Sequence, residues 1–398
     1  MKRTVRLLAA VTSVTLMGGL AACSSAADEP QASTAGPIKV GVLLPLSGPL
    51  AASAAPYKVV FSNIGTGLPN TDKIDGRKVE IVLRDSLGTA AGGSATTRQL
   101  LDQDQVDVVI GPLFTAAGEA SMPLTTQAKK FQSMLTGCPT CGDPAKYPYT
   151  FSVEADRPSQ MPPTVKAIKA AGLSKVGVLV SNDGGGKSYA DTFTAEAQKE
   201  NLNIVKNVSF APNTLDMGAQ VSQLKASGAD VVYIASAVPL DVSTALKAMA
   251  QASYQPAVYG NAALKTTDAT RGIDPATMKT WAASGSGTYT TMPGAPAQTV
   301  AFRDALNKIQ GTTDLPLALN EYASAMDAFG LVKAAIEGTH TTDAEKMTAW
   351  LVKNGYNGVK AKFTFTDIRH NGLTPDAQAL VQPGTLSNGF LTRVGAGK

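Results

Sequence analysis

The chain has 398 residues, of which 44% are hydrophobic and 17% are charged. This length suits two folded domains, and this composition is typical of a globular protein rather than a disordered one. Its 35 basic and 31 acidic residues give a net charge of only +4, and the sequence shows no basic patch that would indicate nucleic-acid binding.

The first 22 residues have the layout of a secretory signal. Lys2, Arg3 and Arg6 precede an apolar stretch over residues 7–20, which is too short to cross a bilayer as a stable helix. The stretch ends in Leu-Ala-Ala-Cys at residues 20–23, which resembles the lipobox of bacterial lipoproteins. We therefore expect a signal peptide over 1–22 and a lipid on Cys23 that tethers the protein to the extracytoplasmic face of a cell membrane.

Residues 23–36 are small and polar, with no apolar period, and predict a flexible spacer between the anchor and the folded body. Removal of the signal peptide would lower the net charge to about +1, so charge says little about partners. The rest of the chain contains no second long apolar run.

A repeat organises the next part of the chain. Residues 39–43 (KVGVL) recur as residues 175–179, and residues 107–110 (DVVI) are echoed by 230–234 (DVVYI). Such short β-branched runs are typical of strands buried on both faces. Helical patterns follow these strands, at 94–103, 190–200 and 220–226. This order predicts parallel βαβ units, and hence an α/β protein with two Rossmann-like lobes of similar topology.

The last third is more helical. Apolar residues recur at helical spacing over 297–310, 318–337 and 342–353, and a strand-like segment follows at 362–365. The duplicated lobes are short, so we expect these helices to complete the first lobe. The chain would then cross between the lobes near Glu154, Gly287 and Gly372. The predicted first lobe comprises 37–154 and 288–372, and the predicted second lobe comprises 155–287 and 373–398.

Several segments resemble one family in the same order. They are IKVGVLLPLSGP (38–49), LRDS (83–86), VIGP (109–112) and EYASAMDA (321–328). Together they resemble the branched-chain amino-acid-binding proteins, the extracytoplasmic solute receptors of ABC importers. The resemblance implies the type 1 periplasmic-binding fold, with two lobes joined by three strands that close on a small solute. It also implies an ABC permease as partner, and we expect a monomer without a cofactor or metal.

The resemblance suggests ligand residues in the first lobe. A hydroxyl four residues after the glycine of the fourth-strand turn binds the ligand carboxylate in this family, and Thr115 matches that position. The loop after the next strand supplies backbone amides and a hydroxyl, which Cys138 and Thr140 match to within a residue. Ser53 stands where the family often has an aromatic residue. Each hydroxyl could instead serve a turn or a helix cap.

The second lobe departs from the family pattern. The positions that hold the ammonium and the aromatic walls in amino-acid binders correspond here to Gly186, Ala237 and Ala262. A buried ammonium without a partner would be costly. We therefore hypothesise a bulkier or non-amino carboxylic solute, such as an aromatic acid. A shifted register would leave Asp183, Asp241 or Asp268 as the acid for an amino acid.

Cys138 and Cys141 form a C-x-x-C motif. A redox pair or a metal site is one interpretation, but outside the cell membrane a disulfide is the default. We predict a disulfide that stiffens the loop beside the ligand. The two histidines, His340 and His370, have no cysteine or carboxylate cluster near them in sequence, and we interpret both as surface residues.

Other motifs indicate competing functions. The segment GGGKS (184–188) resembles a phosphate loop, but position 181 is serine rather than the required glycine, so we interpret it as a ligand-facing loop. An exported hydrolase would need a nucleophile turn and a catalytic histidine, which the sequence does not suggest. A ligand sensor of the same fold that does not transport its solute remains an alternative that the sequence does not distinguish.

Overall fold

The computed structural model describes residues 36–48, 50–138 and 140–395. The described residues all belong to one compact unit of the chain. The predicted signal peptide, Cys23 and all of the predicted spacer except Gly36 lie outside the described residues. None of the described helices is both long and apolar enough to span a lipid bilayer.

The first lobe is built on a six-stranded sheet with the order β2-β3-β1-β4-β5-β6. All neighbouring strands are parallel except β2 and β3. The strands are β1 (Ile38–Leu44), β2 (Lys73–Ile74), β3 (Arg77–Asp85), β4 (Val108–Ile110), β5 (Gln132–Met134) and β6 (Thr150–Ser152). The predicted strands at 39–43 and 107–110 are thus neighbours, with Val40 opposite Val108.

The second lobe has a six-stranded sheet with the order β15-β11-β10-β9-β7-β8. Its strands are β7 (Lys175–Ser181), β8 (Asn203–Phe210), β9 (Val231–Ala235), β10 (Ala257–Gly260), β11 (Ala282–Gly287) and β15 (Gln378–Val381). Only the β11–β15 pair is antiparallel. In this lobe β7 lies between β8 and β9, as β1 lies between β3 and β4 in the first. The two segments of the sequence repeat therefore occupy equivalent places in two similar α/β lobes.

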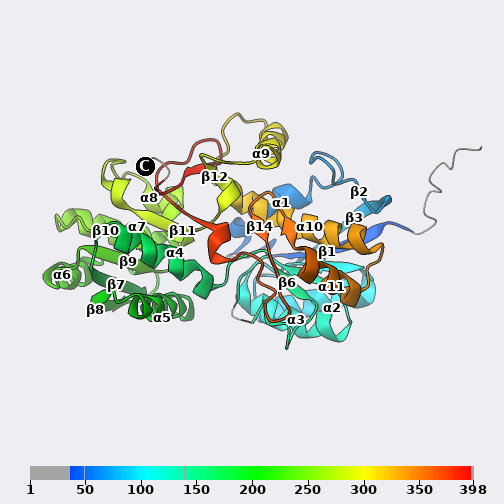
Figure 1. The fold of residues 1–398 in the computed structure, drawn as a ribbon, viewed down its shortest axis with the longest axis horizontal. Helices are drawn as coiled ribbons and strands as arrows, with labels where there is room; N and C mark the ends of the chain where they lie inside the picture. The colour runs from blue at the N-terminus through cyan, green and yellow to red at the C-terminus, as the bar shows by residue number, and fades with distance from the viewer. Residues whose placement is uncertain (1–35, 49, 139, 396–398) are drawn as a thin grey trace, which may run out of the picture. The chain divides into compact units, whose positions relative to one another are not determined.

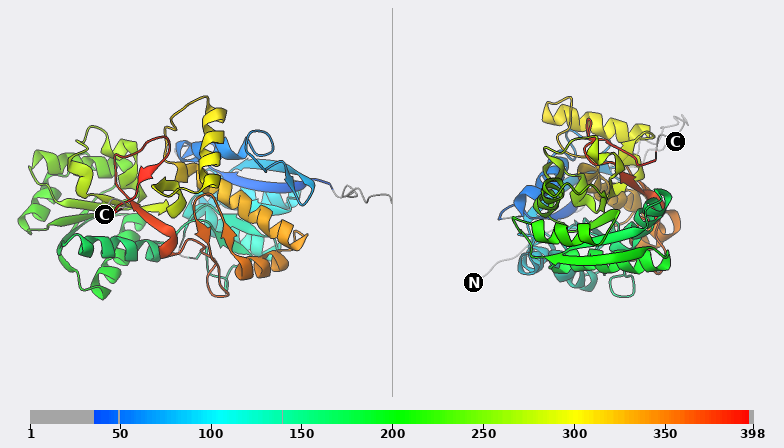
Figure 2. Two further views of the ribbon diagram at one scale, coloured as in Figure 1. Left: turned by 45° about the horizontal axis from the view of Figure 1, so that its top comes forward. Right: turned by 90° about the vertical axis from the view of Figure 1, so that its left-hand side faces the viewer.

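Helices cover both sheets (Figures 1 and 2). Those of the first lobe are η1 (Ala51–Ala54), α1 (Ala55–Phe61), α2 (Ala90–Arg98), η2 (Gln99–Gln103), α3 (Thr115–Gln127), α9 (Ala297–Gln310), α10 (Leu319–Thr339) and α11 (Ala344–Asn354). Those of the second lobe are α4 (Arg157–Ala170), α5 (Gly184–Lys199), α6 (Gly218–Ala226), α7 (Pro239–Gln251), η3 (Ala262–Lys265), α8 (Thr267–Thr270) and η4 (Thr277–Thr280).

Short elements complete the fold. The paired strands β12 (Thr291–Met292) and β16 (Leu391–Thr392) form one small sheet, and β13 (Tyr356–Asn357) and β14 (Lys362–Phe363) form another. Single turns lie at η5 (Thr288–Thr290) and η6 (Pro375–Ala377). The strand predicted at 362–365 is thus shorter than expected, because it pairs only with the two residues of β13.

The helices of the last third pack on the first sheet. Phe329 and Val332 of α10 and Met347 of α11 belong to the same buried core as Val40 and Ile110. Figure 1 shows α10 and α11, in orange, beside the blue and cyan strands of this lobe. Burial of these apolar faces is the dominant favourable term that holds distant parts of the chain together. These helices therefore complete the first lobe.

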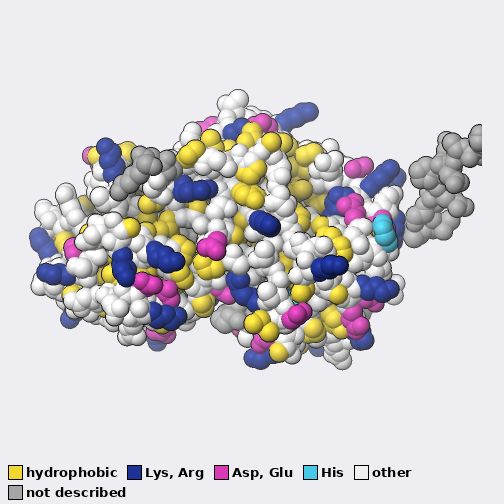
Figure 3. All heavy atoms as spheres, in the orientation of Figure 1, with side chains coloured by type: hydrophobic (Ala, Val, Ile, Leu, Met, Phe, Trp, Pro, Cys, Tyr) yellow, Lys and Arg dark blue, Asp and Glu magenta, His cyan; other side chains and the backbone are white. Residues whose placement is uncertain are grey.

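Three connections join the lobes, between β6 and α4, between β11 and α9, and between β14 and β15. The first and third lie side by side, since Ser152 pairs with Asn371 in a parallel bridge. The second contacts the segment before β14, because the Tyr289 N–H donates to the Lys360 carbonyl (3.0 Å). On the face drawn in Figure 3, basic and acidic side chains are interspersed over both lobes.

Two expectations from the sequence need correction. The glycines at 184–186 are not a loop, because α5 begins at Gly184 and the Asp183 carboxylate caps it by accepting the Gly186 N–H (2.8 Å). His370 is not a surface residue. It is only 2% exposed, because its segment docks against β6 and its ring stacks on Phe151 at 4.0 Å. His340, in contrast, is exposed at the end of α10.

Candidate functional site

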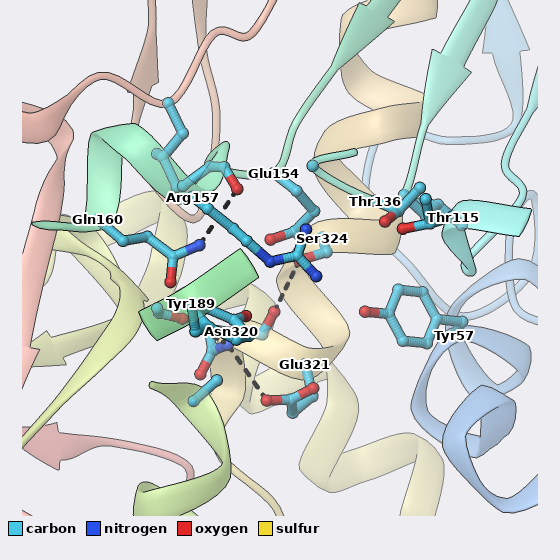
Figure 4. Close-up of a pocket in the computed structure, with 16 residues that line it drawn as sticks. Tyr57, Thr115, Thr136, Glu154, Arg157, Gln160, Tyr189, Asn320, Glu321 and Ser324 are labelled. Carbon is cyan, nitrogen blue, oxygen red and sulfur yellow. Dashed lines mark hydrogen bonds between the residues drawn. The ribbon is translucent and has the colours of Figure 1, made fainter. Parts of the chain in front are cut away.

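A cavity of about 220 Å³ lies between the two lobes (Figure 4). Many of its residues follow the carboxyl ends of strands, where ligands bind in open α/β sheets. The first lobe contributes residues from α1, α3, α10 and the ends of β5 and β6, and the second contributes residues from α4, α5, η3 and β11. They are Tyr57, Thr115, Leu135, Thr136, Gly137, Glu154, Ala155, Arg157, Gln160, Tyr189, Ala262, Gly285, Asn320, Glu321, Ser324 and Leu373.

The first-lobe wall offers neutral hydrogen-bonding groups. Thr115 is the first residue of α3, and no side chain caps the N–H groups of that first turn. Such a helix start favours a negatively charged ligand group. Thr136 and Gly137 follow β5 on the same wall. Gly137 is required by close packing, since a Cβ there would lie 2.1 Å from the Ala155 carbonyl oxygen.

Arg157 brings a positive charge into the cavity. It stands at the start of α4, which Asp156 caps by accepting the Ser159 N–H (2.8 Å). Its guanidinium carbon lies 4.7 Å from the centre of the Tyr189 ring. Its Nε is buried and has no hydrogen-bond partner among the described residues. Figure 4 shows the side chain extending toward the middle of the cavity. Burial raises the pKa of the Tyr189 hydroxyl, and the nearby Arg157 charge opposes that rise.

The acidic residue at the first crossing, Glu154, is neutralised by a lysine. The Lys360 ammonium donates to both carboxylate oxygens of Glu154 (2.8 Å each) and to the Ser324 hydroxyl (2.9 Å). The Ser324 hydroxyl itself donates to Glu154. The Lys360 side chain is 1% exposed, so this ion pair is shielded from solvent on the lysine side. Burial, and then the charges of Glu154 and Glu321, raise the pKa of the Tyr57 hydroxyl well above its usual value.

The second acidic residue, Glu321, faces Lys265 from the other lobe at 3.7 Å. The buried Lys265 ammonium donates to the Gly285 carbonyl (2.9 Å) in its own lobe and to the Asn320 amide oxygen (2.9 Å) across the lobe boundary. Burial lowers the pKa of Lys265, and Glu321 opposes that shift. Because each glutamate has a lysine partner, the unbalanced charge on the cavity is that of Arg157.

The structure brings only part of the predicted ligand set together. Thr115 and Ala262 line the cavity. Ser53 and Ala237 lie in a neighbouring chamber of about 530 Å³, which Ala262 also lines. Gly186 lines neither, because it packs in the first turn of α5, where a Cβ would lie 2.3 Å from the Ser181 carbonyl oxygen.

Cys138 and Thr140 do not line the cavity either, and Thr136 and Gly137 take that place. The structure joins Cys138 and Cys141 in a disulfide, with sulfur atoms 1.99 Å apart. Both cysteines are buried against Met122 and Met134 behind the loop. No group of three or more His, Cys, Asp or Glu side chains within the described ranges is placed to hold a metal ion.

Sequence reasoning missed Arg157, Gln160 and Tyr189, which lie on helices rather than directly after strands. A signal for Arg157 was available, because it lies three positions after the predicted crossing at Glu154. Residues close to a connection between the lobes lie near both of them, and so near the cavity between them. Asn320, Glu321 and Ser324 lie in or beside residues 321–328, which resemble the family, but only the packing of α10 brings them to the cavity.

Comparison with known proteins identifies the family. Residues 37–383 match the model of a family described as periplasmic binding protein. The Leu/Ile/Val-binding protein homolog 3 of Brucella melitensis is 25% identical over 329 residues, which cover 80% of this chain and 83% of the relative. Family members are binding proteins.

Solved structures agree on the fold. A leucine-binding protein of Thermotoga maritima superposes with a TM-score of 0.69 at 18% identity, covering 89% of this chain and 97% of that one. A solute-binding protein of an ABC transporter from R. palustris, in complex with 4-hydroxybenzoate, gives a TM-score of 0.68 at 21% identity, covering 89% and 95%. The match of residues 37–383 to the family model shows that the chain belongs to the periplasmic binding protein family.

Proposed function

We propose that this protein binds a small carboxylate, with the carboxylate paired to Arg157, and delivers it to an ABC permease. The observation that carries the proposal is the Arg157 guanidinium, which stands on the cavity with a buried Nε and no hydrogen-bond partner for it. A buried N–H without an acceptor is costly, and a guanidinium matches a carboxylate in a two-point contact. An anionic solute would supply the missing partner.

The lining favours an aromatic acid over a leucine-type amino acid. An amino acid also brings an ammonium group, which needs a free carboxylate. Both acidic residues of the cavity, Glu154 and Glu321, are already paired with lysines, and the family resemblance aligns Ala262 with the position of the acid in amino-acid binders. The cavity is lined instead by two aromatic residues, Tyr57 and Tyr189. A cavity of about 220 Å³ lies below the range of about 300–1,000 Å³ that is typical of sites for drug-sized ligands. The part of the solute that occupies this cavity is therefore small.

Delivery to a permease would use the closing of the lobes. A solute held by Arg157 from one lobe and Thr115 from the other contacts both only when the lobes are closed. Its binding energy therefore shifts the equilibrium between open and closed forms, and a shift from 1:99 to 99:1 needs about 5.5 kcal/mol of differential affinity. The permease could then recognise the loaded receptor by its shape.

The test is a binding screen by thermal shift and calorimetry with benzoate, 4-hydroxybenzoate, leucine, isoleucine and valine. We expect the aromatic acids to bind and Arg157→Gln to weaken them by about 10-fold or more, as for a lost charged hydrogen bond of about 1.5–3 kcal/mol. Lys166→Gln, an exposed lysine on the same helix, is the matched control. Stabilisation by the branched-chain amino acids alone, or unchanged affinity in Arg157→Gln, would contradict the proposal.

The lipid on Cys23 is also a proposal, supported by the lipobox-like residues 20–23. A tether keeps the receptor concentrated near its membrane partner. Replacement of Cys23 by serine should move the protein from the membrane fraction to the soluble fraction on cell fractionation. Recovery of the variant in the membrane fraction at the wild-type level would argue against the anchor.

A further inference from the structure

A second chamber adjoins the cavity that holds Arg157. It has a volume of about 530 Å³ and is also formed by both lobes. Pro56 comes from the first lobe, Ala237 from the second, and Leu317 from the segment before α10. Ala262 and Glu321 line the chamber and the cavity alike, so the two spaces are neighbours that share a boundary.

The walls of the two spaces differ in chemistry. Ten of the seventeen residues that line the chamber are alanine, proline or leucine. Its four charged residues form two ion pairs, Asp268 with Arg271 at 2.6 Å and Lys265 with Glu321 at 3.7 Å. The chamber therefore offers apolar surface and balanced charges, whereas the cavity offers the unbalanced charge of Arg157. A ligand matched to both spaces has one anionic end and one apolar end.

Of the two residues that line both spaces, Ala262 is small, whereas Glu321 is large and is paired with Lys265. Ala262 begins η3, and Asn261 holds this turn in place by accepting the Ala263 N–H (2.9 Å). Gly285 lies directly against it, since a Cβ at Gly285 would be 3.0 Å from the Ala262 methyl. Ala262 and Gly285 thus present only a methyl group and a hydrogen, and larger side chains at these positions would take up space where the two spaces adjoin.

The chamber also leaves an apolar side chain in contact with water. Leu317 is 41% exposed, and it lies on the chamber wall. Covering it and its apolar neighbours would be favourable, because the gain is proportional to the apolar area removed from water. An apolar part of the solute would provide that cover from within the cleft.

We propose that the solute is an elongated amphipathic carboxylate, whose anionic head pairs with Arg157 while its apolar tail occupies the second chamber. This inference rests on the proposed function and extends it from the head of the solute to its tail. The chamber has more than twice the volume of the cavity, so it has room for a tail larger than the head.

A series of benzoates with one head and growing tails tests the inference. Benzoate and its 4-ethyl, 4-butyl and 4-hexyl derivatives would be titrated into the purified protein by calorimetry. We expect the Kd to fall about fourfold for each methylene group that becomes buried, until the chamber is filled. Leu317→Asn should weaken the dependence of Kd on tail length, because it makes the chamber wall polar. Ala237→Phe should weaken it as well, because the larger side chain fills part of the chamber.

Leu240→Asn is the matched control, because Leu240 is a leucine of similar exposure (49%) that does not line the chamber. It should keep the wild-type dependence on tail length. Binding of benzoate with no gain from longer tails would overturn the inference and leave the proposed function standing. Failure of all four acids to bind would overturn both.

Discussion

Packing makes the two histidines of the chain chemically different. His340 is exposed, whereas His370 is stacked on Phe151 and its Nδ1 lies 3.2 Å from the Thr150 carbonyl oxygen. That contact makes Nδ1 the protonated nitrogen of a neutral ring. Burial lowers the pKa of His370 from its usual 6.5 to about 4. The sequence around the two residues does not distinguish them, and the difference arises from the docking of residues 370–371 on β6.

The lowered pKa of His370 predicts a loss of stability in acid. Between pH 6.5 and pH 4 the unfolded chain binds a proton at this residue and the folded protein does not. The free energy of unfolding should therefore fall as the pH falls through this window, by up to about 3 kcal/mol. His370→Phe keeps an aromatic ring on Phe151 and removes the titration. Urea unfolding at pH 7, 5.5 and 4.5 should show a smaller decrease for this variant, and an unchanged decrease would contradict the assignment.

At the scale of elements, the two repeated strands pack against their neighbouring helices in the same way. Each copy of the KVGVL segment has a central glycine on which a neighbouring side chain packs. A Cβ at Gly41 in β1 would lie 3.1 Å from Leu100, and a Cβ at Gly177 in β7 would lie 2.7 Å from Leu224. Both leucines are fully buried. The missing side chain allows close contact between strand and helix in each lobe.

The predicted helix boundaries agree with the observed ones where apolar residues recur at helical spacing over a long segment. The prediction of 297–310 coincides with α9, and those of 318–337 and 342–353 lie within two residues of the bounds of α10 and α11. The start of α5 differed by six residues from the prediction, because a run of glycines indicates a loop and the Asp183 cap overrides it. Local propensity is weak there, and a single capping contact decides the boundary.

At the scale of the whole molecule, Lys265 connects the lobes. Its ammonium contacts Gly285 in the second lobe and Asn320 in α10 of the first, and the Lys265 side chain is 1% exposed. Breaking one side of a buried, hydrogen-bonded charge leaves its partners unsatisfied. The contact therefore favours the arrangement in which the two lobes meet, and it supplies the positive charge that balances Glu321.

Replacement of Lys265 by methionine should open the unliganded protein and weaken carboxylate binding. The interlobe hydrogen bond is lost, and the unpaired Glu321 then opposes an anionic solute. We expect a larger radius of gyration by small-angle X-ray scattering and a Kd raised about 10-fold or more, as for a buried charge that loses its partner. The exposed Lys279, changed to methionine, is the control. A variant with wild-type radius and Kd would show that Lys265 neither holds the lobes nor balances the site.

The sequence by itself determined the α/β class, the duplication and the family, because these depend on apolar periods and on short segments that stay in order along the chain. It also placed Thr115 and Ala262 on the cavity. Only the tertiary structure decided the charge of the site. Glu154 and Lys360 are 206 positions apart, and Lys265 and Glu321 are 56 positions apart (321 − 265). Contacts at such separations leave no local pattern, so the pairing of both glutamates, and with it the free charge of Arg157, exists only once the lobes have folded and met.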